Sequence, residues 1–236
     1  LGEISPQQAE PGVLTEFTYH LKPQNTSGFD RLAVESAAPL YFTKVARNGV
    51  ELDVQADSTK NGFIVHFPNR IRTDQLIELK FKSSVFRQST RFDVFLKDSN
   101  QDESVRQRVD PGDASAQIES NTNVVSLPVS QNLFANIALN SPVITPNGDG
   151  VNDELRLSAD LVNVLQPRPL RIRLYDLAGH LVYDYSEDVR AGQQQFSWDG
   201  RDRSGTRVTP GVYVLEIAVE GDAGDERAQE VISIVY

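Results

Sequence analysis

Apolar and polar residues alternate along most of this chain, in short runs separated by Gly, Pro, Asn and Asp. Ile77, Leu79 and Phe81, for example, are each followed by a charged residue. Successive side chains of a β-strand point to opposite faces of a sheet, so a period of two predicts strands with one buried and one solvated face. Helical periodicity is hard to find. The pattern therefore predicts a nearly all-β chain.

The first half of the chain has about the number of predicted strands that an immunoglobulin-like sandwich needs. The predicted ranges are 14–21, 31–36, 41–47, 51–55, 62–67, 76–83, 90–97 and 123–128. The dipeptide Asn48-Gly49 lies between two apolar runs, and both residues tolerate positive φ, so a tight hairpin is expected there. The polar stretch from about Asp98 to Asn123 is predicted to be a long loop.

The second half repeats the alternation. Leu170, Ile172 and Leu174 alternate with arginines, and the turn at 176–179 leads into a strand at 180–185. Further strands are expected around Phe196 and Trp198, at 211–219 and at 231–236. A change of composition near Ser130 marks a boundary. We therefore predict two tandem immunoglobulin-like β-sandwich domains, residues 1–130 and 131–236.

The charge of the chain disfavours one class of partner. The formal net charge is −10 and the sequence pI is about 4.8, with Lys and Arg scattered along the chain. A nucleic-acid-binding protein needs a basic surface that follows the phosphates, so we expect no nucleic-acid partner. The acidity indicates a solvated surface, or carboxylates that bind cations.

Other features of composition bear on chemistry and location. The chain contains no cysteine, which excludes disulfides, thiolate metal sites and a thiol nucleophile. It begins at Leu1 and contains no methionine, which suggests a processed mature end or a segment of a longer protein. No apolar run approaches the length of a membrane span.

Motifs in the second half, taken together, resemble a known family. They are TPNGDGVND at 145–153, LYD at 174–176 with Gly179, WDGRD at 198–202 with Gly205, and PGVY at 210–213. In this order and spacing they are similar to the Ig-like domain of flagellar hook-capping proteins and to C-terminal domains of exported bacterial surface and gliding-motility proteins. The resemblance covers about residues 141–236. The first half shows only the generic pattern of Ig-like repeats.

The resemblance implies an Ig-like fold and an extracellular or cell-surface location on an exported bacterial protein. Such domains occur on adhesins, secreted enzymes and secretion substrates, and the family supplies no catalytic residue. Some relatives use the domain as a sorting signal for type IX secretion, and these commonly end in a basic, glycine-containing hairpin. This chain ends in VISIVY at 231–236. We therefore rank the sorting role below a structural one.

Two stretches offer the oxygen ligands that Ca²⁺ requires. The first, residues 147–154, has glycines that permit a sharp turn. It does not match an EF-hand loop, because Arg156 occupies the position of the bidentate acid. The simpler interpretation of this stretch is an Asx-rich turn, and of the second a solvated loop in which Glu103 replaces the helpful glycine. The candidate calcium ligands are Asn147, Asp149, Val151, Asp153 and Glu154, and, more weakly, Asp98, Asn100 and Asp102.

Other residues that could carry chemistry have structural interpretations. Asp199 and Asp202 are expected to cap a hairpin loop, with Trp198 in the core. The histidines His20, His66 and His180 lie far apart in the sequence and match no metal-binding spacing. Nucleophile-elbow, Walker and dinucleotide motifs are lacking, so we expect no enzymatic activity.

Three functional hypotheses follow. The first is a non-catalytic structural or adhesive segment that contacts other envelope proteins or copies of itself. The second is a carbohydrate-binding accessory module of a secreted enzyme, for which aromatics such as Tyr41, Phe42 or Tyr213 would lie exposed in a row. The third is a secretion-sorting or assembly scaffold.

Overall fold

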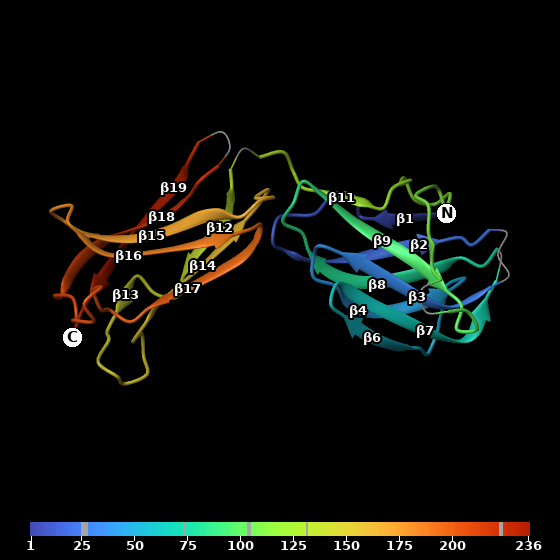
Figure 1. The fold of residues 1–236 in the computed structure, drawn as a ribbon, viewed down its shortest axis with the longest axis horizontal. Helices are drawn as coiled ribbons and strands as arrows, with labels where there is room; N and C mark the ends of the chain where they lie inside the picture. Colours follow the sequence, from blue (N-terminus) through green and yellow to red (C-terminus); the bar gives the residue numbers. More distant parts are fainter. Residues whose placement is uncertain (25–27, 73, 103–104, 131, 222–223) are drawn as a thin grey trace. The chain divides into compact units, whose positions relative to one another are not determined.

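The computed structural model describes residues 1–24, 28–72, 74–102, 105–130, 132–221 and 224–236, and Glu103 lies outside them. Its described residues form strands and loops and contain no helix (Figure 1). The chain divides into two compact units, Leu1–Val129 and Ser130–Tyr236. Each unit has two sheets that enclose an apolar core. The prediction of an all-β chain with two sandwiches is confirmed.

The first unit contains a five-stranded and a six-stranded sheet. The order in the first sheet is β1 (Gly2–Ser5), β2 (Leu14–Leu21), β8 (Ile77–Ser84), β4 (Tyr41–Arg47) and β5 (Val50–Glu51). The order in the second is β10 (Gln107–Arg108), β9 (Ser89–Lys97), β3 (Phe29–Ser36), β7 (Gly62–Ile71) and β6 (Gln55–Thr59), with β11 (Val124–Ser126) also paired to β9.

Phenylalanines from both sheets form the centre of this first core. Phe17 and Phe81 come from β2 and β8, and Phe63 and Phe92 from β7 and β9. Their ring centroids lie 5.4 Å apart for Phe81 and Phe92 and 6.0 Å apart for Phe63 and Phe81. Aromatic pairs at these separations add to the stability that burial alone supplies. The residues alternate with solvent-facing neighbours, as the period of two predicts.

The predicted loop from 98 to 123 is more ordered than expected. It contains β10, and its backbone forms hydrogen bonds with β1. Neither of these strands was predicted from the sequence. Gly2 donates its N–H to the carbonyl of Asp110 at 2.9 Å, and Ile4 donates to Thr122 at 2.8 Å. The single strand predicted at 51–55 is replaced by two short ones, β5 and β6.

The second unit contains a three-stranded and a five-stranded sheet. The order in the first is β12 (Phe134–Leu139), β14 (Leu155–Leu161) and β17 (Gly192–Trp198). The order in the second is β13 (Val143–Ile144), β19 (Glu226–Ile234), β18 (Gly211–Val219), β15 (Arg168–Asp176) and β16 (Leu181–Val189). Only the pair β13–β19 is parallel among the described strands of this unit.

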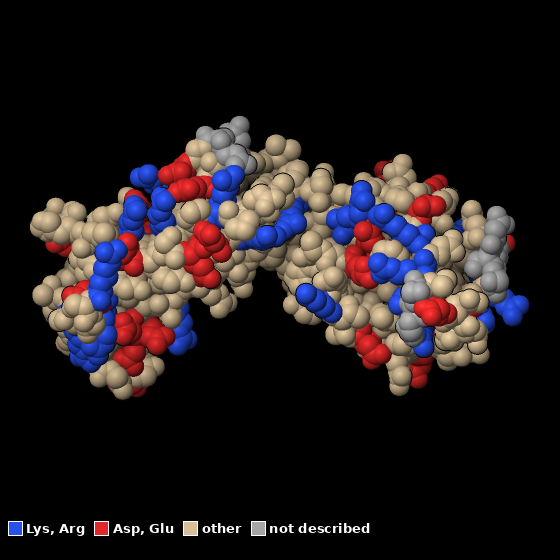
Figure 2. All heavy atoms as spheres, in the orientation of Figure 1, with Lys and Arg blue, Asp and Glu red and all other residues tan. Residues whose placement is uncertain are grey.

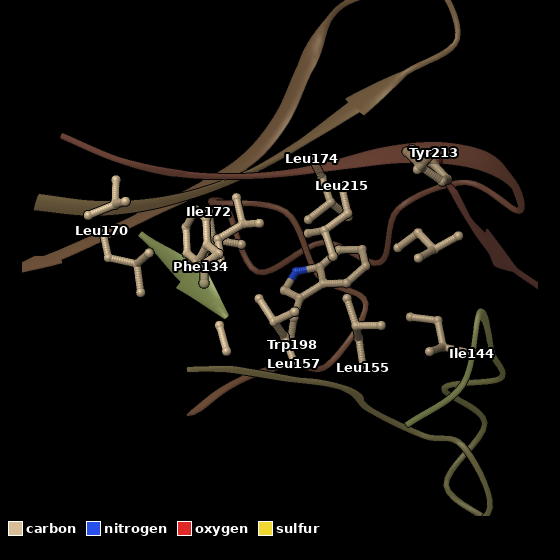
Figure 3. Packing of buried hydrophobic residues seen from close by; sticks show 14 of the residues in the cluster. Phe134, Ile144, Leu155, Leu157, Leu170, Ile172, Leu174, Trp198, Tyr213 and Leu215 are labelled. Atoms are coloured by element: carbon tan, nitrogen blue, oxygen red, sulfur yellow. The ribbon is translucent and has the colours of Figure 1, made fainter. Parts of the chain in front are cut away.

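Trp198 lies at the centre of the second core, among side chains from both sheets (Figure 3). Leu155 and Leu157 reach it from β14, and Leu174 and Leu215 face them from β15 and β18. The ring is 2% exposed. The expectation that Trp198 packs in the core is confirmed.

Candidate functional site

The loop between β13 and β14 is held by its own acidic side chains. Asp153 accepts the backbone N–H groups of Gly148 at 2.6 Å and of Gly150 at 2.7 Å. Asp149 accepts the N–H of Val151 at 2.8 Å, and Asn147 accepts that of Asp149 at 2.9 Å. Gly148 and Gly150 have φ of +87° and +85°, which glycine adopts without strain. The bonds of Asn147 and Asp149, each to the N–H two residues further on, form successive Asx turns, and Asp153 closes the loop from its far end.

These hydrogen bonds affect the acidity of the loop and its capacity for calcium. The N–H groups of Gly148 and Gly150 hold the pKa of Asp153 below its ordinary value, because they stabilise the carboxylate. The same oxygens would have to bind Ca²⁺. The structure therefore places Asn147, Asp149 and Asp153 together in one loop, and a calcium ion there would compete with backbone donors. The Asx-rich turn stays the prediction for this loop, with a calcium site as the alternative.

The weaker calcium candidate lies in the loop after β9. Asp98 forms an ion pair with Arg70 and accepts the backbone N–H of Asn100 at 3.0 Å. Both bonds lower the pKa of Asp98. The Ser99 N–H donates to Asp30 at 2.8 Å, which ties the loop to β3. The described residues of this loop thus use their carboxylates to anchor it, and Asp102 also has a partner.

The WDGRD motif builds a compact loop after β17. The indole N–H of Trp198 donates to the carbonyl of Arg201 at 2.6 Å. Asp199 accepts the N–H of Arg201 at 3.2 Å. Asp202 accepts the Ser204 hydroxyl at 2.7 Å and the N–H groups of Thr206 at 2.9 Å and Ser204 at 2.8 Å, and these bonds lower the pKa of Asp202. The predicted capping role of both aspartates is confirmed.

The aromatic residues proposed for sugar binding do not form a row. Tyr41 is 56% exposed on β4, whereas Phe42 packs against Phe63 at 5.5 Å between ring centroids. Tyr213 is 4% exposed in the core of the other unit, and its hydroxyl donates to the carbonyl of Thr209 at 2.6 Å. The platform required by the carbohydrate-binding hypothesis is therefore not made by these residues.

The histidines occupy separate sites. His20 is buried, and burial lowers its pKa. Nε2 of His66 lies 2.9 Å from Oδ2 of Asp57, and Nδ1 of His180 lies 2.9 Å from Oδ2 of Asp176. Within the described ranges, no group of three or more His, Asp or Glu side chains is placed to hold a metal ion.

A groove of about 630 Å³ runs over the outer face of the three-stranded sheet. Glu154 is the one carboxylate among its described lining residues, and it lies 3.5 Å from Arg156. The other lining residues are Ala138, Leu139, Asn140, Leu157, Ser158, Gln195, Phe196 and Ser197.

The five-stranded sheet of the second unit has a long open edge. β16 pairs only with β15 among the described strands, so its other side is unpaired over nine residues. Ser186, Glu187 and Asp188 on this strand are exposed. At the opposite edge, β13 covers β19 only at Ser233 and Ile234. An unpaired edge is a template for another strand.

The charges of the surface are mixed. Figure 2 shows basic and acidic side chains close to one another on the visible face of both units. Ion pairs between charged side chains include Lys44 with Glu51 at 2.8 Å and Arg108 with Asp93 at 2.5 Å. The absence of a nucleic-acid partner stays a prediction from the net charge.

Comparison with protein families identifies the second unit. Residues 137–234 match the family described as the CHU_C type IX secretion signal domain. The second unit is therefore a type IX secretion signal domain of a secreted surface protein, and the chain is exported to the cell surface or beyond. This finding corrects our ranking of the sorting role. The match runs from residue 137 to residue 234 and includes most of the last strand, β19, so the ending VISIVY does not exclude the sorting family.

Comparison with solved structures returns large bacterial proteins at low identity. Dimeric latent PorU from Porphyromonas gingivalis is 10% identical, with a TM-score of 0.37, and the match covers 97% of this chain and 18% of PorU. PorZ, a surface component of the type IX secretion system of Porphyromonas gingivalis, is 14% identical, with a TM-score of 0.30, over 61% of this chain and 15% of PorZ.

A β-glucuronidase from Parabacteroides merdae is 12% identical, with a TM-score of 0.32, over 95% of this chain and 28% of the enzyme. The chain thus spans less than a third of the length of each of these proteins. At these TM-scores the likenesses carry no functional argument. No curated protein sequence matches the chain. In the described residues, no helix has the length and apolarity to cross a membrane.

Proposed function

We propose that this chain is a non-catalytic structural and adhesive segment of its surface protein, and that it acts through contacts with other proteins of the cell envelope. The second unit directs export, and the first unit is displayed with it. The partners are envelope proteins, including further copies of the same protein.

The open edge of β16 is the observation that carries this proposal. Its nine residues present backbone groups that pair with no other described strand. An extended segment of a partner can add to such an edge through main-chain hydrogen bonds. Tyr185 and Glu187 lie on this edge strand, and the Tyr185 hydroxyl donates to the Glu187 carboxylate at 2.6 Å.

Photo-cross-linking on native cells tests the contact role. A photoreactive residue replaces Ser186 in the full-length protein, and the matched control replaces Val151, which is 62% exposed in a loop. We expect covalent protein adducts from position 186 and few from position 151. Adducts with glycan, or none with protein at either position, would contradict the proposal.

Deletion tests the division of labour between the units. We expect that loss of residues 130–236 keeps the protein inside the cell, whereas loss of residues 1–129 leaves export unchanged. The measurement is surface labelling of intact cells, with total protein from lysed cells as the reference. Export without the second unit would contradict the assignment.

A further inference from the structure

An apolar row crosses four strands on the outer face of the five-stranded sheet. Leu181 of β16 is paired with Tyr175 of β15, Tyr175 with Val214 of β18, and Val214 with Val231 of β19. None of the four side chains belongs to the core cluster of this unit. Leu181 is 46% exposed and Val231 is 61% exposed. Contiguous apolar surface of this kind marks an interaction site.

A β-bulge places Leu181 in this row. The register of β15 with β16 shifts after Leu174, which pairs with Tyr183, so that Tyr175 pairs with Leu181. As a result, the neighbours Val182 and Tyr183 both pack against the core. A bulge re-aims side chains in this way, and without it Leu181 would point to the other face of the sheet.

The adjacent row on the same face is charged, and its acids already have partners within the chain: Asp184 pairs with Arg203, which lies outside the row, and Glu216, only 7% exposed, pairs with Arg173. The row consists of Asp184, Arg173, Glu216 and Gln229, one from each strand in the same order. Arg173 lies 3.7 Å from Glu216, and the Gln229 amide donates to Glu216 at 3.4 Å. A partner that covers the apolar row also covers Arg173 and Glu216. It should therefore place an acidic group over Arg173 and a basic group over Glu216.

We propose that the outer face of this sheet binds the same face of a second copy of the chain, about a two-fold axis that runs parallel to the strands between β15 and β18. This axis places Leu181 over Val231 of the second copy and Tyr175 over its Val214. It also places Arg173 over Glu216 of the second copy, and the reverse. The surface is thus complementary to itself both in apolar character and in charge.

A two-fold axis along the apolar row instead is disfavoured. That axis would lay the charged row against the neighbouring row that contains Val212 and Ser233. Arg173, whose side chain is 33% exposed in the single chain, would then lose water without gaining an opposite charge from the partner, which costs free energy. The inference rests on the proposed contact role, and it names the partner.

Two complementary variants of the full chain test the axis. The variant Leu181→Lys and the variant Val231→Glu each place one charge in the apolar row at an exposed position. In a dimer of one variant with itself, the new charge faces an apolar side chain of the other copy at both places where position 181 meets position 231. In a mixed dimer, Lys at 181 meets Glu at 231, while Val231 of the first variant meets Leu181 of the other.

Sedimentation of the purified chains gives the result. We expect dimers of the wild-type chain, at least a tenfold rise in Kd for each variant alone, and dimers with one copy of each variant in the mixture. Added salt should weaken the mixed dimer more than the wild-type dimer. The matched controls Leu165→Lys and Val129→Glu change exposed apolar residues outside the row, and should leave Kd unchanged.

Two outcomes would overturn the inference. One is a monomeric wild-type chain at concentrations of order 100 μM, the weak end of specific association. The other is a mixture in which the two folded variants stay monomeric. Far-ultraviolet circular dichroism checks that both are folded. A monomeric chain that still forms adducts with other envelope proteins through position 186 would remove this inference and leave the proposed function standing.

Discussion

Glu3 and Ala114 lie 111 residues apart in the chain, and the backbone N–H of Ala114 donates to Oε1 of Glu3 at 2.9 Å. The N–H of Ser115 donates to the same oxygen at 2.7 Å. The Glu3 side chain is completely buried. Through these bonds, the first strand of the chain holds the loop that follows β10, and the two segments close one side of the first sandwich.

The substitution Glu3→Ala is expected to destabilise the first unit by about 1–3 kcal/mol, because it leaves buried N–H groups of Ala114 and Ser115 without an acceptor. Urea unfolding followed by circular dichroism measures the change. The control Glu119→Ala removes an exposed acid from the same loop and should change stability by less than about 0.5 kcal/mol. Equal effects of the two substitutions would show that the bonds to Glu3 contribute little.

The substitution Leu215→Ala is expected to cost about 2–5 kcal/mol, since it opens a cavity beside Trp198 in the second core. Trp198 is the only tryptophan in the chain, so its fluorescence follows the unfolding of this unit. The control Leu165→Ala changes a side chain that is 61% exposed and should leave the transition in place. A small effect of Leu215→Ala would mean that the site collapses around the lost atoms.

The loop that contains Asp153 is expected to loosen in acid. The pKa of Asp153 is lowered in the folded chain, so its contribution is present above the ordinary pKa and is lost as pH falls through the lowered value, below about pH 4. Amide signals of Gly148 and Gly150 in NMR spectra should shift together in that range. The variant Asp153→Asn should abolish the shift, whereas Glu154→Gln should keep it.

Calcium provides a second test of the same loop. We expect that millimolar Ca²⁺ leaves the Gly148 and Gly150 amide signals unchanged at pH 7, because the oxygens of Asp153 already accept these donors. A calcium site would shift both signals. It would also stabilise the second unit, by about 2.7 kcal/mol at one hundred times the Kd, and chelator would reverse the gain. That outcome would establish Asn147, Asp149 and Asp153 as ligands.

The first unit is expected to lose stability in mild acid because of His20. Burial lowers the pKa of His20, so the folded chain favours the neutral ring. The stabilisation is complete above the ordinary pKa of about 6.5 and is lost as pH falls below it. The urea midpoint of His20→Gln should therefore change less between pH 7.5 and 5.5 than that of the wild-type chain. His180→Gln, at an exposed position, should behave as wild type.

Local sequence determined much of the fold. The bounds of β2, β4 and β18 agree with the predicted ranges 14–21, 41–47 and 211–219, because alternation with a period of two is a property of adjacent residues. Asn48 and Gly49 adopt φ of +49° and +78° in the predicted hairpin for the same local reason. The motifs of the second half likewise indicated an exported Ig-like domain.

Not every strand was predicted, although β14 has a clear alternating pattern in the sequence. Leu155, Leu157, Ala159 and Leu161 alternate with polar residues and form β14, which the sequence reading did not assign. Strands as short as β1 and β10 have too few residues to show a period. The last strand begins at Glu226, earlier than predicted, because its exposed half is polar.

Only the tertiary structure decided which residues meet. Nothing in the local sequence indicates that Glu3 is buried, because its hydrogen-bond partners lie more than a hundred residues away. Leu181 faces solvent only because the register of β15 and β16 shifts beside it. Register depends on pairing between distant segments, which a single sequence does not encode as a local pattern. The sequence by itself therefore determined most of the strands and the location of the protein, and the pairing of the strands decided its surfaces.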